Sequence, residues 1–146
     1  MTLKFHIPGD PVAQPRPRVY KSRTVSNPAK VKQWKKTVAT YALQAAWEAG
    51  WSAEADMPLH LSALFLMPRP KSMPKRRADR EHMVVRPDLD NLVKALKDAC
   101  NEILWVDDSQ VAAMSIAKQR AALGEATGVL VTVHTLREKD MEDLPF

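Results

Sequence analysis

The sequence contains a single cysteine, Cys100, among its 146 residues, so an internal disulfide is excluded. It also lacks any apolar run approaching the length of about 18 residues that a membrane-spanning helix needs. The first ten residues, MTLKFHIPGD, hold no long apolar segment of the kind found in secretory signals. We therefore expect one cytoplasmic domain, long enough to bury a substantial core, with no membrane partner.

Acidic residues are missing from a long N-terminal stretch. No Asp or Glu occurs between Pro11 and Trp47, although the whole chain has 17 acids against 22 Lys and Arg, a formal net charge of +5. Two basic blocks result, the first with Arg16, Arg18, Lys21, Arg23, Lys30, Lys32, Lys35 and Lys36, and the second with Arg69, Lys71, Lys75, Arg76, Arg77, Arg80 and Arg86. Such clusters favour a polyanionic partner through phosphate contacts and counterion release. A solvated basic surface without a partner would have the same composition.

Hydrophobic periodicity predicts two helices and four strands. Alternating apolar residues indicate strands, spacings of three and four indicate amphipathic helices, and a run apolar on both faces indicates a buried central strand. In chain order the predicted elements are a strand at 3–7, a helix at 29–49, a central strand at 58–67, a helix at 90–104, and strands at 111–117 and 129–136. This β-α-β-α-β-β order predicts an α/β fold of the α+β kind, with a single mixed β-sheet packed against two main helices.

The connections between these elements carry further predictions. Residues 8–28 and 68–87 are rich in Pro and Arg and are expected to be long basic loops, the second of them mobile. The sequence AALGEATG is expected to join the last two strands as a hairpin. We expect a single domain over residues 1–136, followed by an acidic, disordered tail at 137–146.

Two acids stand where the second helix is predicted to begin, in RPDLDNL. Residues i and i+2 of an extended segment point to the same side, so Asp88 and Asp90 can converge on one point. Pro87 supports this geometry, because it favours an extended Arg86 before it. A purely structural explanation also exists, in which Asp90 caps the helix and Asp88 interacts favourably with the helix dipole.

A second acidic pair, Asp107 and Asp108, follows the same helix in WVDDSQ. Asp is common in turns, so turn chemistry could account for this pair alone. A helix of about 14 residues spans about 20 Å. The two pairs would then lie too far apart to share a metal, unless the acids meet across elements or across a dimer interface.

Several acids within a basic surface are the composition expected of a metal-dependent nuclease. Mg²⁺ takes oxygen ligands, activates water and stabilises the leaving oxygen in phosphodiester hydrolysis. The basic side chains would hold the phosphates, and the acidic side chains would hold the metal. Lys94, at i+4 from Asp90 on the same helix face, could stabilise charge on the scissile phosphate, pair with Asp90, or do both.

The string RPDLDNLxK followed by WVDDSQV resembles the RusA family of Holliday junction resolvases. The family pattern D-x-D-N-x-x-K, then D-D-x-Q-V, falls here on Asp88, Asp90, Asn91, Lys94, Asp107, Asp108, Gln110 and Val111. The stretch GDPVAQPRPR, residues 9–18, is similar to the family's N-terminal loop. The resemblance covers the whole element order and is specific over Arg86 to Lys118.

The resemblance implies a homodimeric endonuclease, bacterial or phage-encoded, that cuts four-way DNA junctions symmetrically in recombination and repair. It implies that Asp88, Asp90 and Asp108 hold Mg²⁺, for which Mn²⁺ could substitute, and that Lys94 is catalytic. The spacing from helix to turn is slightly shorter than is usual in the family. Asp107 is therefore kept as an auxiliary or alternative ligand.

The basic residues expected to contact DNA lie in the two basic loops and are Arg16, Arg18, Lys21, Arg23, Lys75, Arg76, Arg77 and Arg86. No small-molecule cofactor is expected. Three other functions stay open: a DNA-binding module without catalysis, a nuclease of the same chemistry acting on flaps or forks, and an RNA-directed enzyme, which only the resemblance disfavours. Cys100, next to the buried stripe of the second helix, is expected to pack in the core.

Overall fold

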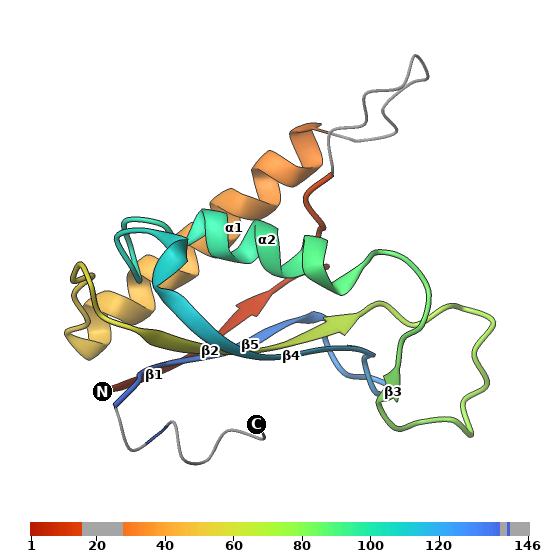
Figure 1. Cartoon of the computed structure of the whole chain (residues 1–146). Helices are drawn as coiled ribbons and strands as arrows, with labels where there is room; N and C mark the ends of the chain where they lie inside the picture. The colour runs from red at the N-terminus through yellow and green to blue at the C-terminus, as the bar shows by residue number, and fades with distance from the viewer. Residues whose placement is uncertain (16–27, 138–139, 141–146) are drawn as a thin grey trace.

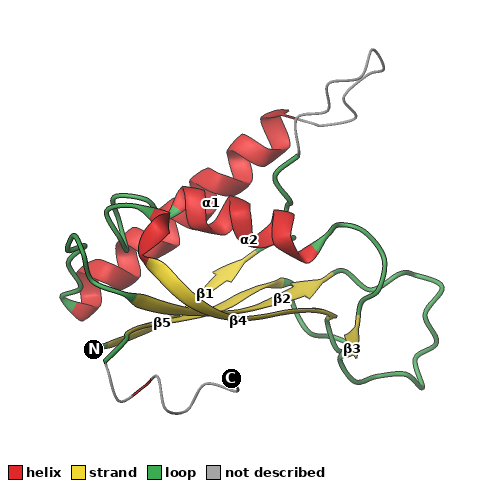
Figure 2. Ribbon diagram, in the orientation of Figure 1, coloured by secondary structure: helices red, strands yellow, loops and turns green. Residues whose placement is uncertain are grey.

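A five-stranded mixed sheet carries two helices on one face in the computed structural model, which describes residues 1–15, 28–137 and 140 (Figures 1 and 2). The elements are β1 (Thr2–Pro8), α1 (Pro28–Ala49), β2 (Leu59–Met67), β3 (Glu81–His82), α2 (Leu89–Ala99), the 3₁₀ helix η1 (Asp108–Gln110), β4 (Val111–Arg120) and β5 (Gly128–Thr135). The predicted fold class and element order are confirmed, with β3 as an added short strand inside the second basic loop. No helix in the described part of the chain is long and apolar enough to cross a membrane.

The strand order is β1-β5-β2-β4-β3, so the predicted hairpin between the last two strands is wrong. β2 lies between them, pairing in parallel with β4 and antiparallel with β5. A strand buried as fully as β2 needs hydrogen-bonded partners on both sides, and these two strands provide them. The connection at 121–127 passes the end of β2, and the Leu123 amide donates to the Ala78 carbonyl (2.8 Å).

The core lies between the sheet and the two helices (Figure 2). Along β2 the residues that face the helices are Leu59, Leu61, Ala63 and Phe65, all buried. Phe65 and Trp105 are among the largest fully buried side chains, and each side chain of this kind stabilises the fold by about 1.5–3 kcal/mol relative to exposure. Cys100 is also fully buried, which confirms its predicted place in the core. Burial raises the pKa of its thiol to about 12.

Both helices end at identifiable residues. α1 ends before Gly50, whose φ of +65° lies in the left-handed region that glycine adopts at the least cost. α2 is shorter than predicted and ends at Ala99, because Cys100 caps it and the chain then turns. In that turn the Glu102 amide donates to the Trp105 carbonyl (2.7 Å). An α2 of 11 residues spans about 16 Å.

Candidate active site

Asp88 occupies the N-cap position of α2, where φ is −69° and ψ is 140°. Its carbonyl accepts hydrogen bonds from the amides of Asn91 and Leu92 (both 3.2 Å), but its carboxylate makes no capping bond. Asp90 lies in the first turn, and both aspartates are exposed. The structural explanation in which Asp90 caps the helix is therefore wrong. The cap position does not use the Asp88 carboxylate, which leaves it available to a ligand.

The segment that leads into α2 is held to β4 by a lysine that no sequence pattern singled out. Lys118 Nζ donates to the carbonyl of Val85 (2.6 Å) and to the carbonyl of Pro87 (2.7 Å). The Arg86–Pro87 peptide bond between these two carbonyls is cis. Lys118 itself is half-buried. A lysine in an alternating strand would ordinarily be assigned to the solvent, so its partners could be found only in the folded chain.

The N-terminal loop lies beside the start of α2, although the two are far apart in sequence (Figure 1). The Gln14 amide donates to the Asn91 carbonyl (3.0 Å). The described part of the N-terminal loop thus reaches the end of α2 that carries Asp88 and Asp90. The predicted DNA contacts Arg16, Arg18, Lys21 and Arg23 lie outside the described residues.

Lys94 projects from α2 with 58% of its side chain exposed. Its Nζ lies 3.8 Å from Asp98 Oδ2, and Lys35 Nζ from α1 lies 3.7 Å from the same oxygen. Long ion pairs of this kind on a surface contribute about 0–1 kcal/mol, so they hold Lys94 only weakly. Its ammonium can therefore turn toward a phosphate bound near the start of the helix.

The second acidic pair belongs to the turn after α2, where η1 begins. The Ser109 hydroxyl donates to Asp107 Oδ2 (2.6 Å). This hydrogen bond is the largest of the causes that hold the pKa of the Asp107 carboxyl below its usual value, and the adjacent Asp108 adds to the effect. Asp107 is therefore occupied with the turn, whereas the half-buried Asp108 comes one residue later, inside η1.

Gln110 anchors this turn to the rest of the fold. Its side-chain oxygen accepts from the amides of Val106 (2.8 Å) and Asp107 (3.1 Å). Its side-chain nitrogen donates to the carbonyls of Glu54 (2.7 Å) and Met57 (3.1 Å). The glutamine of the D-D-x-Q-V motif thus has a structural role, which the sequence pattern alone did not reveal.

The two acidic pairs do not meet within one chain. Among residues 1–15, 28–137 and 140, no three His, Cys, Asp or Glu side chains lie close enough to hold a metal ion together. The donor chemistry of Asp88 and Asp90 suits Mg²⁺, which often takes only one or two carboxylates and completes its shell with water and phosphate. Asp108 is not brought to them within one chain.

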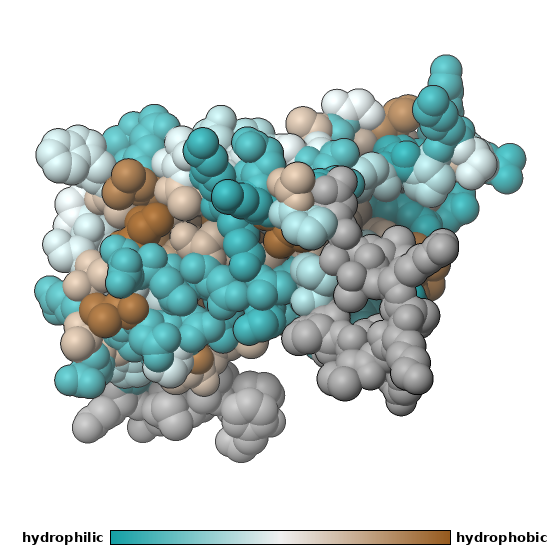
Figure 3. Space-filling view, turned by 90° about the horizontal axis from the view of Figure 1, so that it is seen from above, coloured by the Kyte–Doolittle hydropathy of each residue, from teal (hydrophilic) through white to brown (hydrophobic). Residues whose placement is uncertain are grey.

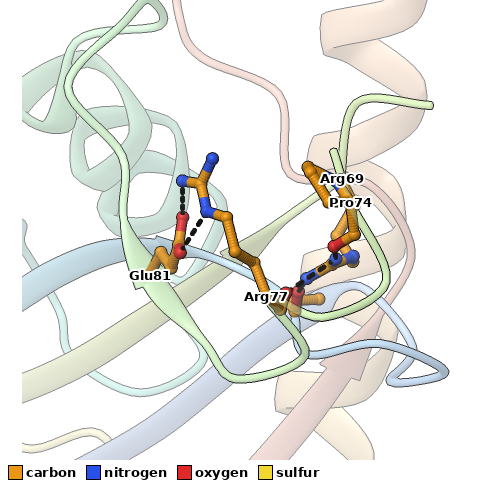
Figure 4. Close-up of polar contacts among 5 residues, drawn as sticks. Arg69, Pro74, Arg77 and Glu81 are labelled. Atoms are coloured by element: carbon orange, nitrogen blue, oxygen red, sulfur yellow. Dashed lines mark hydrogen bonds and ion pairs between the residues drawn. The ribbon is translucent and has the colours of Figure 1, made fainter. Parts of the chain in front are cut away.

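The second basic loop is braced by its own arginines, as Figure 4 shows. Arg69 donates to the carbonyls of Arg77 (2.9 Å) and Pro74 (3.5 Å). Arg77 makes a two-bonded ion pair with Glu81, with Nε at 2.8 Å from Oε1. Arg80 pairs with Glu125 (2.7 Å), whose pKa is lowered to about 2 chiefly by this arginine. The segment predicted to be a mobile loop therefore has an internal framework.

This framework divides the basic residues of the loop into two groups. Arg77 stays partly exposed, but Glu81 already uses two of its donors. Lys75 and Arg76 are exposed, as is Arg86, and no hydrogen bond or ion pair connects these three to the described residues. From the helix side the surface is mostly hydrophilic with small apolar patches between (Figure 3). Lys75, Arg76 and Arg86 are therefore better placed than Arg77 to bind phosphate.

Comparison with known proteins identifies the family of this chain. Residues 8–134 match the family described as Endodeoxyribonuclease RusA. A similar protein is the uncharacterized protein YqaN of Bacillus subtilis (strain 168), which is 33% identical over 126 residues, covering 80% of this chain and 86% of YqaN. The matched region includes both acidic pairs, Lys94 and Lys118. The chain therefore belongs to the RusA family of Holliday junction endodeoxyribonucleases.

Proposed function

We propose that this protein is a Mg²⁺-dependent homodimer that resolves four-way DNA junctions by paired, symmetric phosphodiester hydrolysis, in the recombination or repair of bacterial or phage DNA in the cytoplasm. The observation that carries the metal assignment is Asp88, an exposed aspartate at a helix N-cap whose carboxylate does no capping. Because its carboxylate makes no capping bond, Asp88 adds little to helix stability through its side chain, and a ligand is the better explanation of its place here.

Asp88 and Asp90 would hold the metal at the start of α2, together with water and a phosphate oxygen of the DNA. When bound, Mg²⁺ supplies an activated water and a charge that stabilises the leaving oxygen. Lys94 would approach the same phosphate from the next turn of the helix and stabilise its developing negative charge. Mn²⁺, which also takes oxygen ligands, could replace Mg²⁺.

A homodimer would let Asp108 complete this site. In a two-fold interface, the contact of residue i with residue j is repeated as j with i. Two α2 helices related in this way could bring Asp88 and Asp90 of one subunit to Asp108 of the partner subunit. The two-fold axis would repeat this arrangement, so that the dimer has two equivalent sites. Exposed apolar side chains flank both acidic pairs, with Val84 91%, Val85 51% and Val106 48% exposed. The interface that joins the two pairs would bury these side chains against the partner.

The basic residues would hold the arms of the junction. Lys75, Arg76 and Arg86 are exposed on the described surface, and Arg77 would contribute less because of Glu81. The sequence assigns the same role to Arg16, Arg18, Lys21 and Arg23, which lie outside the described residues. Phosphate contacts of this kind release counterions, so junction affinity should fall steeply with salt.

The direct test is cleavage of a labelled synthetic four-way junction with Mg²⁺ and with EDTA, beside a linear duplex of the same sequences. We expect paired symmetric nicks on the junction, only with the metal. Preferential cleavage of a flap or a fork would overturn the proposed substrate. Equal cleavage in EDTA would overturn the metal requirement.

Mixed dimers test the shared site separately. Asp88→Asn and Asp108→Asn subunits, each inactive alone, are mixed under conditions that exchange subunits. If the acids meet across the interface, the heterodimer contains one complete site and should nick one strand. If each site lies within a subunit, every site in the mixture carries one substitution, and no activity should return.

A further inference from the structure

Lys118 holds three alternate residues of the segment that enters α2. Its ammonium binds the carbonyls of Val85 (2.6 Å) and Pro87 (2.7 Å), and its own carbonyl accepts from the Met83 amide (3.3 Å). Ammonium–carbonyl hydrogen bonds are charge-assisted and are roughly twice as strong as neutral ones. Residues 83–87 are thus tied at intervals to one point of the sheet.

That point lies within the paired part of the sheet. In the parallel pairing of β2 with β4, Lys118 is aligned with Phe65, which is fully buried beneath the helices. Aligned residues of neighbouring strands point to the same face, so the Lys118 side chain lies on the face that carries α2. β4 is hydrogen-bonded to β2 on one side and to β3 on the other. The anchor therefore moves with the sheet and not with the loop.

The second carbonyl that Lys118 binds belongs to the peptide group joining Pro87 to Asp88. The orientation of this peptide plane sets the direction in which the Asp88 side chain leaves the backbone, because the peptide group is planar. No ion pair links Lys118 to a carboxylate in the described parts of the chain. Its charge acts on the backbone of the acid-bearing segment, and its half-buried position suits this contact better than a contact with DNA.

We propose that Lys118 is a positioning residue, which aims the Asp88 carboxylate by fixing the Val85 and Pro87 carbonyls to β4. The inference rests on the proposed function, in that Asp88 is taken to bind the metal. The role differs from that of a phosphate-binding lysine, because it predicts slower cleavage without weaker junction binding. Groups that orient the ligands of a metal commonly change activity by roughly 10- to 100-fold when removed.

The test compares Lys118→Met, Lys118→Arg and Lys4→Met in the full-length protein. Methionine keeps the length and the apolar stem of lysine but removes the donors, whereas arginine keeps donors and charge. Lys4 is an exposed lysine on β1 and controls for the loss of one positive charge from a strand. Single-turnover cleavage, junction affinity and hydrogen–deuterium exchange of peptides covering 83–92 are measured for each.

For Lys118→Met we expect cleavage to slow by roughly 10- to 100-fold, with junction affinity little changed. Exchange should rise in peptides covering 83–92 and stay unchanged in β5, which would show that the fold is retained. Lys118→Arg should recover much of the rate, and Lys4→Met should match the unmodified protein. Unchanged cleavage and exchange in Lys118→Met would overturn the proposal, as would a parallel loss of affinity and cleavage without faster exchange.

The exchange measurement separates this inference from the proposed function. If the unmodified protein cuts no junction with Mg²⁺ or Mn²⁺, the proposed function fails. Faster exchange in Lys118→Met would then still establish that Lys118 holds the segment, and unchanged exchange would overturn that role as well.

Discussion

The two acidic pairs look alike in the sequence, but the fold uses them differently. At the start of α2, Asp88 holds a cap position through its backbone alone. At the turn after α2, Asp107 accepts a bond from Ser109, and Gln110 fixes the backbone around it. The first pair is thus supported by its neighbours without using the Asp88 carboxylate. In the second pair Asp107 serves the turn, which favours Asp108 as the ligand of the proposed metal.

The largest effect should come from the first pair. Asp88→Asn and Asp90→Asn keep the size of the side chain but lose its negative charge. We expect single-turnover cleavage to fall by more than roughly 100-fold, which exceeds the usual loss when a group that only orients a metal ligand is removed. Junction binding in EDTA should persist. Asp56→Asn is a matched control, because Asp56 is exposed and its φ of 62° suits asparagine. Normal cleavage by Asp88→Asn would show that the free carboxylate of the first pair has no catalytic role.

The second pair should divide into a strong and a weak effect. Asp108→Asn is expected to slow cleavage by roughly 100-fold or more, as for a metal ligand, and Asp107→Asn by about 10-fold or less. Asparagine at 107 can still accept the Ser109 hydrogen bond, so the turn should survive. The measurement is single-turnover cleavage of the same junction at saturating Mg²⁺. The opposite order would make Asp107 the principal ligand and Asp108 the auxiliary.

Gln110, which anchors the turn of the second pair, should affect the stability of the fold more than the rate of cleavage. Gln110→Ala removes four hydrogen bonds to backbone groups, and we expect the free energy of unfolding to fall by about 1–3 kcal/mol. Gln119→Ala is the control, since its amide makes one long contact with His82 (3.4 Å), and it should change stability by less than about 0.5 kcal/mol. Denaturant unfolding measures both. Equal stability of the two variants would show that Gln110 does not anchor the turn.

The smallest effect concerns the pKa of Asp107. Ser109→Ala removes the main cause of the lowered pKa, so the Asp107 pKa should rise toward its ordinary value. In the unmodified protein the lowered pKa gives stability above the pKa of the unfolded chain, and this is lost as pH falls through the folded value. Carboxyl NMR titration of both proteins checks the shift. An unchanged Asp107 pKa would show that the hydrogen bond does not control it.

Cleavage provides a second readout for Ser109→Ala. At neutral pH the Asp107 carboxyl is ionised with or without the hydrogen bond, so the rate should change little if Asp107 serves the turn. A large loss of cleavage would instead give Asp107 a direct part in metal binding, and the comparison between the two aspartates would have to be redrawn.

The sequence was sufficient for those features that depend on local chemistry. The buried strand at β2 followed from its apolar run, the end of α1 from Gly50, and the burial of Cys100 from its place beside an apolar stripe. The family followed from a motif whose residues are close in sequence. These features depend on neighbouring residues, which the sequence displays directly.

The tertiary structure decided what depends on distant partners. Strand pairing is such a case, because β4 and β5 are consecutive in sequence and yet both pair with β2. The early end of α2 is another, because Trp105 and Leu104 are buried in the turn and not on the helix. The roles of Gln110 and Lys118 likewise depend on carbonyls 31 to 56 residues away.

The sequence by itself determined which residues are candidates for the chemistry, since the affinity of carboxylates for metal ions and of basic side chains for phosphate depends on side-chain type. Only the folded chain decided which of them are free to act. The Asp88 carboxylate is left out of its helix cap, Asp107 is taken up by its turn, and Arg77 is paired with Glu81. The physical reason is that a polar group bonds to whatever partner the fold brings within reach, and long-range contacts choose that partner.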